Sequence, residues 1–579
     1  MTRLFNDPTA FADELLAGFV AANQDRVRAV PGGVVRATVS APGTVALVVG
    51  GGSGHYPAFG GLVGAGLAHG AAMGNLFASP STQQVVSVAR AASNGGGVLL
   101  SYGNYAGDVL NFDAAEAQLA AEGIEARTVV VTDDIASAPA AERHKRRGIA
   151  GDLTVFKVAG AASEAGYPLE EVVRVARLAN ERTRSFGVAF TGCTLPGASE
   201  PLFTVPAGRM ALGLGIHGEP GIGETDIPTA DGLAELFVER LLAELPEGVD
   251  APAGQRVTVL LNGLGSVKYE ELFVVYGGIA SRLEAVGIEL VEPEVGEFCT
   301  SFDMAGVSLT MFWLTEELET LWSAAADAPG YRKGSVAPRE RVRVAEPAGP
   351  SSEAVTAPAS EESRAAAARV AVAVEAIAAV IDAHVDELGR IDAIAGDGDH
   401  GIGMQRGATA AAGAACRAAD AGAGAGTVLA RAADAWSDRA GGTSGALWGV
   451  MLRALGARLG DEAAPDAAAV AEGCRDALAG IRSYGKAEVG DKTMVDAIVP
   501  FVDTLGARVA AGDELATAWT AAAAAATEAA AATAELLPRM GRARPHAERS
   551  LGTPDAGAHS FGLIATAVAA TLPRKDLVS

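Results

Sequence analysis

Three aspartates crowd into the stretch GRIDAIAGDGDHG, residues 389–401. Asp392, Asp397 and Asp399 stand within eight residues of one another, together with four glycines. Carboxylates this close repel each other unless a positive charge lies among them. Oxygen ligands at close spacing suit hard cations, and Mg²⁺ is usually held by a few carboxylates while phosphate oxygens complete its octahedron. The stretch predicts a magnesium site, and a solvated acidic turn is the alternative.

Other uses of these aspartates fit less well. An EF-hand calcium loop that starts at Asp397 needs Asp or Asn at its fifth position and Glu at its twelfth, where this chain has Gly401 and Ala408. A helix N-cap uses one aspartate and not three. The magnesium interpretation also requires a phosphate-binding segment in the same half of the chain.

Glycine-interrupted segments in that half could bind phosphate. GGTSGALWG, residues 441–449, is a turn with two hydroxyl side chains, and its backbone N–H groups could form an anion-binding nest. GRARPHAERSLGTPDAGAHS, residues 541–560, supplies three arginines. GKAEVGDKTMVD, residues 485–496, is not a Walker A loop, because Asp491 stands where the lysine should follow the glycine. With the aspartates, these segments predict a nucleotide site that is neither of the Rossmann type nor a P-loop.

The motifs IDAIAGDGDHG, GGTSGALWG, GDKTMVD and GRA…ERSLG…DAGAHS, in this order, resemble the nucleotide-binding part of the dihydroxyacetone kinase family across essentially all of residues 365–579. The resemblance implies an all-helical barrel in which three aspartates hold two Mg²⁺ ions that bridge the phosphates of ATP. The positions that match the metal ligands are Asp392, Asp397 and Asp399. The positions that match the phosphate and nucleotide contacts are His400, Gly401, Ile402, Gly403, Thr443, Ser444, Gly485, Met494, Arg542, Asp555, Ala556 and Gly557.

The N-terminal half contains three turns that each carry one residue able to transfer a proton. VVGGGSGHYPAFGG contains His55, GNYAGDVLNF contains Asp108 and GLGIHGEPG contains His217. The first two turns follow apolar runs, and in α/β domains ligands gather at the carboxyl ends of strands. Each residue alone could be an ordinary loop residue, but the three turns together predict a site for an acceptor substrate.

These turns and RRGIAGDLTVFKVAGAASE, residues 146–164, resemble the substrate-binding part of the same family. The resemblance implies that His217 bonds covalently to a ketone as a hemiaminal. It also implies that Asp108 is the base for the attacking hydroxyl group and that His55 is the partner acid and base. The positions that would hold the substrate hydroxyl groups are Gly52, Ser53 and Gly54.

Three positions depart from the usual pattern of that family. Tyr56 stands where Glu is common, Gly103 where Lys is common, and Phe59 where a polar residue is common. Loss of a lysine beside the substrate is expected to remove a charge and to open space. Some members of the family act on four-carbon ketoses such as erythrulose, and an altered pocket agrees with such a substrate.

The resemblance therefore implies a phosphotransferase with an alcohol acceptor. Its substrates would be ATP, with Mg²⁺, and a short ketose, either dihydroxyacetone or a ketotetrose such as D- or L-erythrulose. It also implies a homodimer. Two alternatives remain open: a phosphotransferase-system form in which ADP stays bound as a cofactor, and a ketose sensor without catalysis. Fusion of both parts in one chain favours exchangeable ATP.

The elements that must position these residues change once along the chain. Residues 1–330 carry short β-branched runs between glycine turns, with helical patterns between them, which predicts α/β structure with largely parallel sheets. We expect two α/β subdomains here, divided near residue 185. Residues 331–364 are rich in Pro, Ser, Glu and Arg and read as a linker. Residues 365–579 are rich in alanine with helical periodicity, which predicts an all-α bundle or barrel.

Composition excludes several classes of protein. A chain of 579 residues is too long for one core. Its net charge of −25 argues against nucleic acid or an anionic membrane as partner. Its four cysteines lie far apart, so neither a zinc site nor a disulfide framework is indicated. The N-terminus has no signal-peptide pattern, and the alanine-rich stretch 516–537 predicts a packed helix rather than a membrane span, so we expect a cytoplasmic protein.

Overall fold

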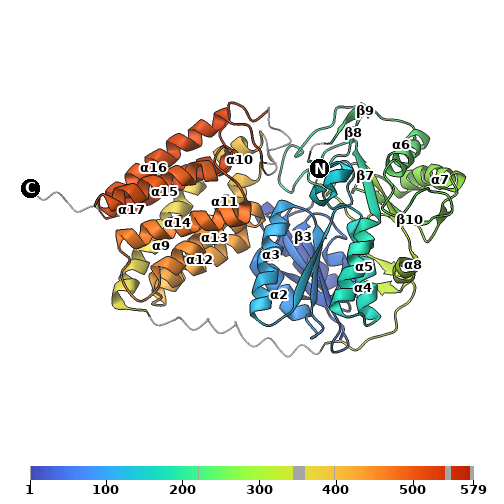
Figure 1. Ribbon diagram of the computed structural model, residues 1–579, viewed down its shortest axis with the longest axis horizontal. Helices are drawn as coiled ribbons and strands as arrows, with labels where there is room; N and C mark the ends of the chain where they lie inside the picture. Colours follow the sequence, from blue (N-terminus) through green and yellow to red (C-terminus); the bar gives the residue numbers. More distant parts are fainter. Residues whose placement is uncertain are drawn as a thin grey trace, which may run out of the picture. The chain divides into compact units, whose positions relative to one another are not determined.

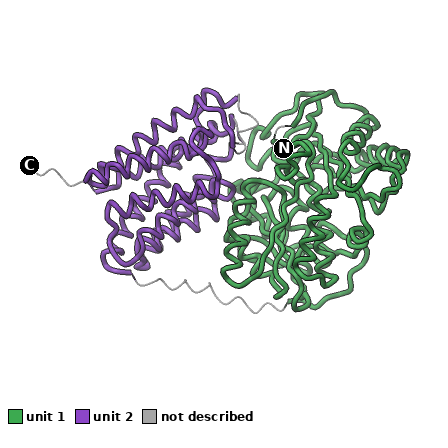
Figure 2. Tube along the Cα trace, viewed as in Figure 1, with its two compact units in different colours: residues 1–343 green, residues 344–579 purple. Residues whose placement is uncertain are grey.

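A computed structural model describes residues 2–219, 221–342, 359–394, 396, 398–540 and 549–573. The chain divides into two compact units, residues 1–343 and 344–579 (Figure 2). The division falls later than the expected end of the first domain at residue 330. The reason is that β15 (Arg332–Lys333) pairs with β14 (Ala326–Asp327), and the N–H of Val342 donates to the carbonyl of Ala37.

The first sheet of the N-terminal unit is mostly parallel. Four neighbouring strands run parallel, and two antiparallel strands extend one edge. In spatial order the strands are β1 (Val27–Val30), β2 (Gly33–Arg36), β4 (Gly70–Leu76), β3 (Ala46–Ser53), β5 (Val98–Gly103) and β6 (Ala126–Val131).

Helices cover both faces of this sheet (Figure 1). Ala46 and Val48 of β3 pack in one core with α2 (Thr82–Ala92) and α3 (Ala106–Ala121), whereas Leu47 and Val49 pack in another with α4 (Asp152–Glu164) and α5 (Leu169–Glu181). Successive side chains of a strand point to opposite faces, so a strand covered on both faces reads as one continuous apolar run.

The second sheet is largely antiparallel, so the expectation of largely parallel sheets is wrong for this half of the unit. Its strands in spatial order are β11 (Glu289–Leu290), β10 (Arg256–Gly263), β13 (Gly306–Trp313), β7 (Thr183–Ala189), β8 (Arg209–Leu212) and β9 (Gly223–Asp226), with β12 (Glu294–Gly296) also on β10. Helices α6 (Ala230–Leu242) and α7 (Tyr269–Ala285) pack on one face. The other face of β10 and β13 joins the core beside α4, through Leu260 and Phe312.

Smaller elements complete the N-terminal unit. They are η1 (Pro8–Ala10), α1 (Phe11–Ala22), η2 (Gly60–Leu62), η3 (Ala140–Lys145) and α8 (Glu316–Ser323).

The described residues of the C-terminal unit are helical, apart from turns. The helices are α9 (Glu361–Ala383), α10 (Val385–Asp392), α11 (His400–Asp420), α12 (Ala425–Ala440), α13 (Gly442–Leu459), α14 (Ala467–Gly485), α15 (Val495–Ala510), α16 (Leu515–Ala532), η4 (Thr533–Glu535) and α17 (Ala556–Thr571). From α11 to α17 each α-helix packs on the next, and α9 contacts both α11 and α17. The ring is therefore closed, and the predicted combination of an α/β half with an all-α helical barrel is confirmed.

Alanine explains how these helices approach one another so closely. Buried alanines such as Ala408, Ala411 and Ala415 line the inner face of α11, and they leave room for neighbouring backbones. Larger side chains fill the centre, where the rings of Trp436 and Trp448 stack with centroids 4.9 Å apart. In the part of the chain that the structure describes, no helix is long and apolar enough to cross a membrane.

Candidate active site

Two of the predicted catalytic residues meet in the N-terminal unit. His55 follows the carboxyl end of β3, and His217 lies in the turn after β8. Although 162 residues separate them in the sequence, their Nε2 atoms are 3.0 Å apart. His55 is almost completely buried, and the side chain of His217 is 9% exposed.

The hydrogen bonds around this pair determine where its protons lie. His55 Nδ1 lies 2.7 Å from the carbonyl oxygen of Thr300, which can only accept, so Nδ1 carries a hydrogen. His217 Nδ1 lies 2.9 Å from Glu219 Oε1 and donates to that carboxylate. The Nε2 atoms of the two rings face each other across the short contact.

The buried His55 ring is neutral. Burial, and then the interaction with His217, lower the pKa of His55 to about 3. His55 is therefore uncharged near pH 7. His217 lies between this ring and the Glu219 carboxylate.

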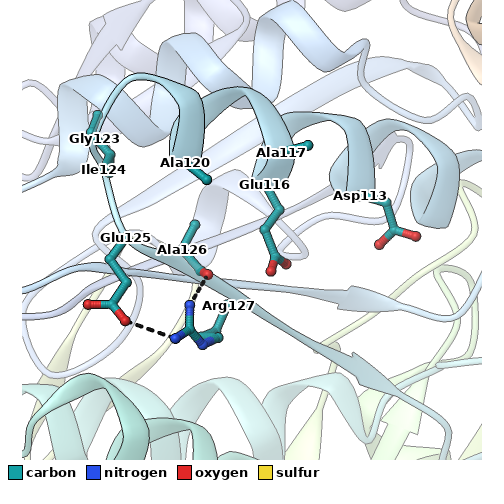
Figure 3. A pocket seen from close by; sticks show the side chains of 9 residues that line it. All are labelled: Asp113, Glu116, Ala117, Ala120, Gly123, Ile124, Glu125, Ala126 and Arg127. Carbon is teal, nitrogen blue, oxygen red and sulfur yellow. Dashed lines mark hydrogen bonds and ion pairs between the residues drawn. The ribbon is translucent and has the colours of Figure 1, made fainter.

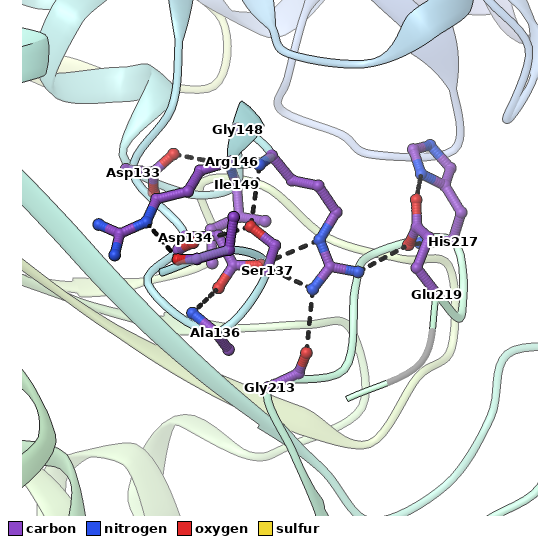
Figure 4. A network of polar contacts seen from close by, with 12 residues as sticks. Asp133, Asp134, Ala136, Ser137, Arg146, Gly148, Ile149, Gly213, His217 and Glu219 are labelled. Carbon is purple, nitrogen blue, oxygen red and sulfur yellow. Dashed lines mark hydrogen bonds and ion pairs between the residues drawn. The ribbon is translucent and has the colours of Figure 1, made fainter. Parts of the chain in front are cut away.

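Glu219 belongs to a longer polar network that the sequence analysis missed (Figure 4). It also accepts a hydrogen bond from the backbone N–H of His217, at 3.0 Å. Arg147 lies 3.9 Å from Glu219 and donates to buried Asp134 at 2.8 Å and to the carbonyl of Gly213. The signal in the sequence was the Glu two residues after the histidine in GIHGEPG. The network holds the His217 turn against the second sheet.

Aromatic rings enclose the two histidines. Phe77 stacks on His55 with centroids 4.8 Å apart and meets His217 edge-on at 5.1 Å. Tyr105, just before α3, meets the other side of His217 at 4.7 Å, and its hydroxyl group donates to the carbonyl of Gly148. Burial raises the pKa of Tyr105 well above its usual range, so this ring stays neutral. These rings form an apolar wall around the two imidazoles.

Asp108 lies in the first turn of α3 and is 8% exposed. Asp108 lies about one helical turn after Tyr105, and the ring of Tyr105 contacts His217. The helix N-terminus favours a negative charge at this point. Asp108 therefore lies at the same helix start as Tyr105, and its role as base stays a prediction.

The predicted substrate-binding residues form the end of β3. A Cβ atom at Gly52 would lie 2.7 Å from the backbone nitrogen of Ala78, and one at Gly54 would lie 2.6 Å from the Phe302 ring. Gly54 has a positive φ of 111°. Only glycine fits both positions. The hydroxyl group of Ser53 donates to the carbonyl of Gly74, and its oxygen can still accept a hydrogen bond.

The three departures from the family pattern have different surroundings. Tyr56 is half exposed. Phe59 is buried and packs near Phe156. A Cβ atom at Gly103 would lie 3.2 Å from the carbonyl oxygen of Gly148, which is a close contact. The expectation that this position opens space beside the substrate stays a prediction.

A hollow elsewhere on this unit is separate from the histidines (Figure 3). It has a volume of about 580 Å³ and lies between the end of α3 and β6. Its polar lining comes from Asp113, Glu116, Glu125 and Arg127, and no predicted site residue lines it.

In the C-terminal unit the predicted nucleotide residues gather around helix starts. His400 begins α11, and its ring reaches the hydroxyl group of Ser560 on α17 at 3.1 Å and that of Ser444 on α13 at 3.4 Å. A Cβ atom at Gly557 would lie 3.4 Å from the Cβ of Met494, which directly precedes α15. Starts of α11, α13, α15 and α17 therefore lie together, and helix N-termini attract anions.

The remaining nucleotide positions have these places. Gly401, Ile402 and Gly403 are in the first turn of α11, Thr443 is in the first turn of α13, Gly485 ends α14, Asp555 caps α17, and Ala556 is its first residue. Arg542 lies outside the described residues.

Carboxylates surround the same helix starts. Asp392 accepts from the N–H of Gly398 at 2.8 Å, and Asp555 accepts from that of Ala558 at 2.7 Å. Asp399 keeps solvent contact, yet the protein packed around it and the charge of Asp392 raise its pKa to about 7. Burial, together with Asp392 and Asp496, likewise raises the pKa of Asp555 to about 7. Repulsion of this kind is what a bound cation would relieve.

The predicted magnesium ligands are brought together only in part. Asp392 and Asp399 interact electrostatically, whereas Asp397 lies outside the described residues. Among residues the structure describes, no group of three His, Cys, Asp or Glu side chains is close enough to hold a metal ion. Asp392 and Asp399 fit a cation by charge, and the ligand set stays a prediction.

Two family models match the chain. The Dak1 domain matches residues 17–330, and the DAK2 domain matches residues 394–570. The two matched regions correspond to the α/β unit and to the helical barrel.

Relatives and a solved structure match over almost the full length. The chain is 62% identical to an L-erythrulose kinase of Pectobacterium atrosepticum, over 99% of this chain and 97% of the relative. It is 56% identical to a D-erythrulose kinase of Mycolicibacterium smegmatis, over 98% of both chains. The crystal structure of the dihydroxyacetone kinase from C. freundii in complex with AMP-PNP and Mg²⁺ is 30% identical, with a TM-score of 0.52, over 99% of this chain and 100% of that one. The chain therefore belongs to the dihydroxyacetone kinase family and is a kinase that transfers a phosphoryl group to an alcohol.

Proposed function

We propose that this protein is an ATP-dependent, Mg²⁺-requiring kinase that phosphorylates a terminal hydroxyl group of erythrulose, with dihydroxyacetone as a poorer substrate. The names of two relatives at 62% and 56% identity support a ketotetrose. The dihydroxyacetone kinase solved with AMP-PNP and Mg²⁺ supports the phosphoryl donor and the cation. Family resemblance also favours a homodimer.

The observation that carries this proposal is the arrangement of His217 between His55 and Glu219. We propose that His217 forms a hemiaminal with the ketone. The Nε2 lone pair of His217 attacks the carbonyl carbon. The C=O π pair moves to oxygen, which takes a proton from solvent, relayed by His55 Nε2. The product has a new N–C bond, a hydroxyl group and a substituted imidazolium, and its Nδ1–H stays on Glu219.

The other proposed roles follow from position. Asp108, at the start of α3, takes the proton of the attacking hydroxyl group. Asp392, Asp397 and Asp399 would hold two Mg²⁺ ions, which neutralise charge on the phosphates when bound. The backbone N–H groups at the starts of α11, α13 and α17 bind phosphate oxygens, with His400, Thr443 and Ser444 beside them. Phosphoryl transfer needs such positioning more than covalent help.

A substrate panel tests this function. We expect kcat/KM with Mg·ATP to rank L- or D-erythrulose above dihydroxyacetone, and both above glyceraldehyde. The assay contains no phosphate-carrier protein. Turnover that appears only after a carrier protein is added would instead identify the form with bound ADP, and binding of ketose without any turnover would identify a sensor.

Glu219→Gln is expected to weaken ketone binding by about 10–100-fold, because the hydrogen bond that stabilises the imidazolium loses its charge. The measurement is the dissociation constant of erythrulose in the absence of ATP. Glu224→Gln on β9 is the matched control, since it makes the same change at an exposed side chain. Equal affinity in Glu219→Gln and the unmutated protein would contradict the role of this carboxylate.

The double variant Gly103→Lys with Tyr56→Glu is expected to shift preference toward dihydroxyacetone by about ten-fold, the scale of one hydrogen bond. Both changes restore residues common in the family. The readout is the ratio of kcat/KM for dihydroxyacetone to that for erythrulose, with Tyr56→Glu alone as the control. An unchanged ratio would show that neither position contributes to the choice between the two ketoses.

A further inference from the structure

Asp152 is a buried carboxyl group that the proposed mechanism does not use. It is the first residue of α4 and is 3% exposed. Its Oδ1 has no hydrogen-bond partner among the described residues. Buried polar atoms are nearly always bonded, and an unbonded one costs about 1–3 kcal/mol of stability. Asp152 therefore needs a partner that the described residues do not supply.

The neighbouring Asp133 is a contrast within the same region. It is also fully buried, but its carboxylate accepts hydrogen bonds from the N–H groups of Ile149 and Gly151, both at 2.9 Å. The loop before α4 thus satisfies one carboxyl group and leaves the other open.

Two glycines lie against the Asp152 carboxyl group. A Cβ atom at Gly148 would lie 2.7 Å from Oδ1, and one at Gly103 would lie 3.3 Å from Oδ2. The hypothetical Cβ of Gly148 would also lie 2.4 Å from the Cα of Gly103. Both positions lack a side chain, so the carboxyl oxygens lie against the backbone of these two glycines, near the carboxyl end of β5.

The same segment borders the proposed ketone site. Gly148 accepts a hydrogen bond from Tyr105, and the ring of Tyr105 contacts His217. Asp152 also interacts electrostatically with Asp108, the proposed base. Cys299 also interacts with Asp152: burial, and then the charges of Asp152 and Asp133, raise the pKa of its thiol. Asp152 therefore lies near Tyr105 and Asp108.

The protonation state of Asp152 suits an uncharged ligand. Burial, followed by the charges of Asp133 and Asp108, raises the pKa of Asp152 well above its usual range. The group is then an uncharged acid, with one O–H donor and one free acceptor. A hydroxyl group, which also donates and accepts, matches both.

We propose that Asp152 is a specificity-determining residue whose carboxyl group binds a non-reacting hydroxyl group of the acceptor ketose. The assignment rests on the proposed ketose kinase function and adds to it the group that distinguishes a polyhydroxylated ketone from a simple one. Sites that hydrogen-bond a substrate hydroxyl group reject the analogue without it, because the protein's polar group is left unpaired.

The test compares erythrulose with hydroxyacetone. Hydroxyacetone has a single hydroxyl group, which is the one to be phosphorylated, so it has no further hydroxyl group for Asp152 to bind. We expect Asp152→Ala to lower kcat/KM for erythrulose by about ten-fold or more and that for hydroxyacetone by less than about two-fold. Asp152→Asn, which can still donate and accept, should retain most of the activity with erythrulose. The KM for ATP should not change.

Ser163→Ala is the matched control, because Ser163 is buried on the same helix but already donates to the carbonyl of Val45. It should lower Tm and leave the preference for erythrulose unchanged. Asp152→Ala should not lower Tm, since it removes an unbonded buried group. Equal losses with both ketones, or a lower Tm with unchanged preference, would overturn the assignment.

Dissociation constants for both ketones without ATP separate this proposal from the proposed function. The unmutated protein could bind erythrulose more tightly than hydroxyacetone, lose this preference in Asp152→Ala, and yet phosphorylate neither ketone. That result would support the hydroxyl-binding role of Asp152 and refute erythrulose as the substrate of the kinase. Turnover of erythrulose with the same preference in Asp152→Ala would keep the function and refute the site.

Discussion

Asp399→Ala is expected to abolish turnover, with kcat reduced by at least about 10³-fold. The reason is that the cation that neutralises charge on the phosphates loses one of its proposed ligands. Asp397→Ala should do the same. Ketone binding should survive in both variants, since His217, His55 and Glu219 belong to the N-terminal unit. The measurements are kcat at saturating ATP and the erythrulose dissociation constant of the full chain without ATP.

Asp386→Ala is the control for this pair, because Asp386 is an exposed carboxylate on α10, the helix that ends at Asp392. It should keep near-normal kcat. Near-normal turnover in Asp399→Ala and Asp397→Ala at saturating Mg²⁺ would refute the metal assignment. Loss of ketone binding in either variant would show instead that the substitution disturbs the whole chain.

His217→Ala and Asp108→Asn are expected to separate ketone capture from phosphoryl transfer. Without His217 the covalent adduct is lost, but some transfer can persist because Asp108 and the nucleotide site remain. Discrimination against glycerol should weaken, since the step that tests for a carbonyl group is gone. In Asp108→Asn the adduct should still form, while kcat falls by about 10²–10⁴-fold, the usual cost of losing a general base.

Crystals soaked with erythrulose and kinetics with erythrulose and glycerol check this pair. Continuous density from His217 Nε2 to the carbonyl carbon is expected in Asp108→Asn and not in His217→Ala. His144→Ala, which replaces an exposed histidine on η3, should behave like the unmutated protein. A ketone at van der Waals distance from the His217 ring in fully active crystals would rule out the hemiaminal.

The pH behaviour of ketone capture follows from His55. Because the pKa of His55 is lowered to about 3, this ring stays neutral throughout the range from about pH 5 to 8, and its own titration leaves ketone capture unchanged there. A loss of capture within that range would therefore point to another group.

Several features of the fold could be read from the sequence for local reasons. Alanine-rich segments with helical spacing predict the barrel helices, and β-branched runs such as VALVVGGGSG predict β3. Strand direction was not predictable. The apolar run of β10 is buried on both faces, by Leu261 in one core and Leu260 in another, so it has no alternation that would distinguish an antiparallel from a parallel sheet.

The sequence by itself determined the motifs, because each depends on neighbouring residues. Its glycines at 52 and 54, its acidic stretch at 389–401 and the order of its motifs all predict a kinase of this family. Only the tertiary structure decided which motifs touch. The 3.0 Å contact of His55 with His217, the link from Glu219 through Arg147 to Asp134, and the close approach of Asp152 to two glycines each join segments from different strands and loops. Such contacts depend on how sheets and helices pack over long sequence separations, and spacing along the chain does not encode those distances.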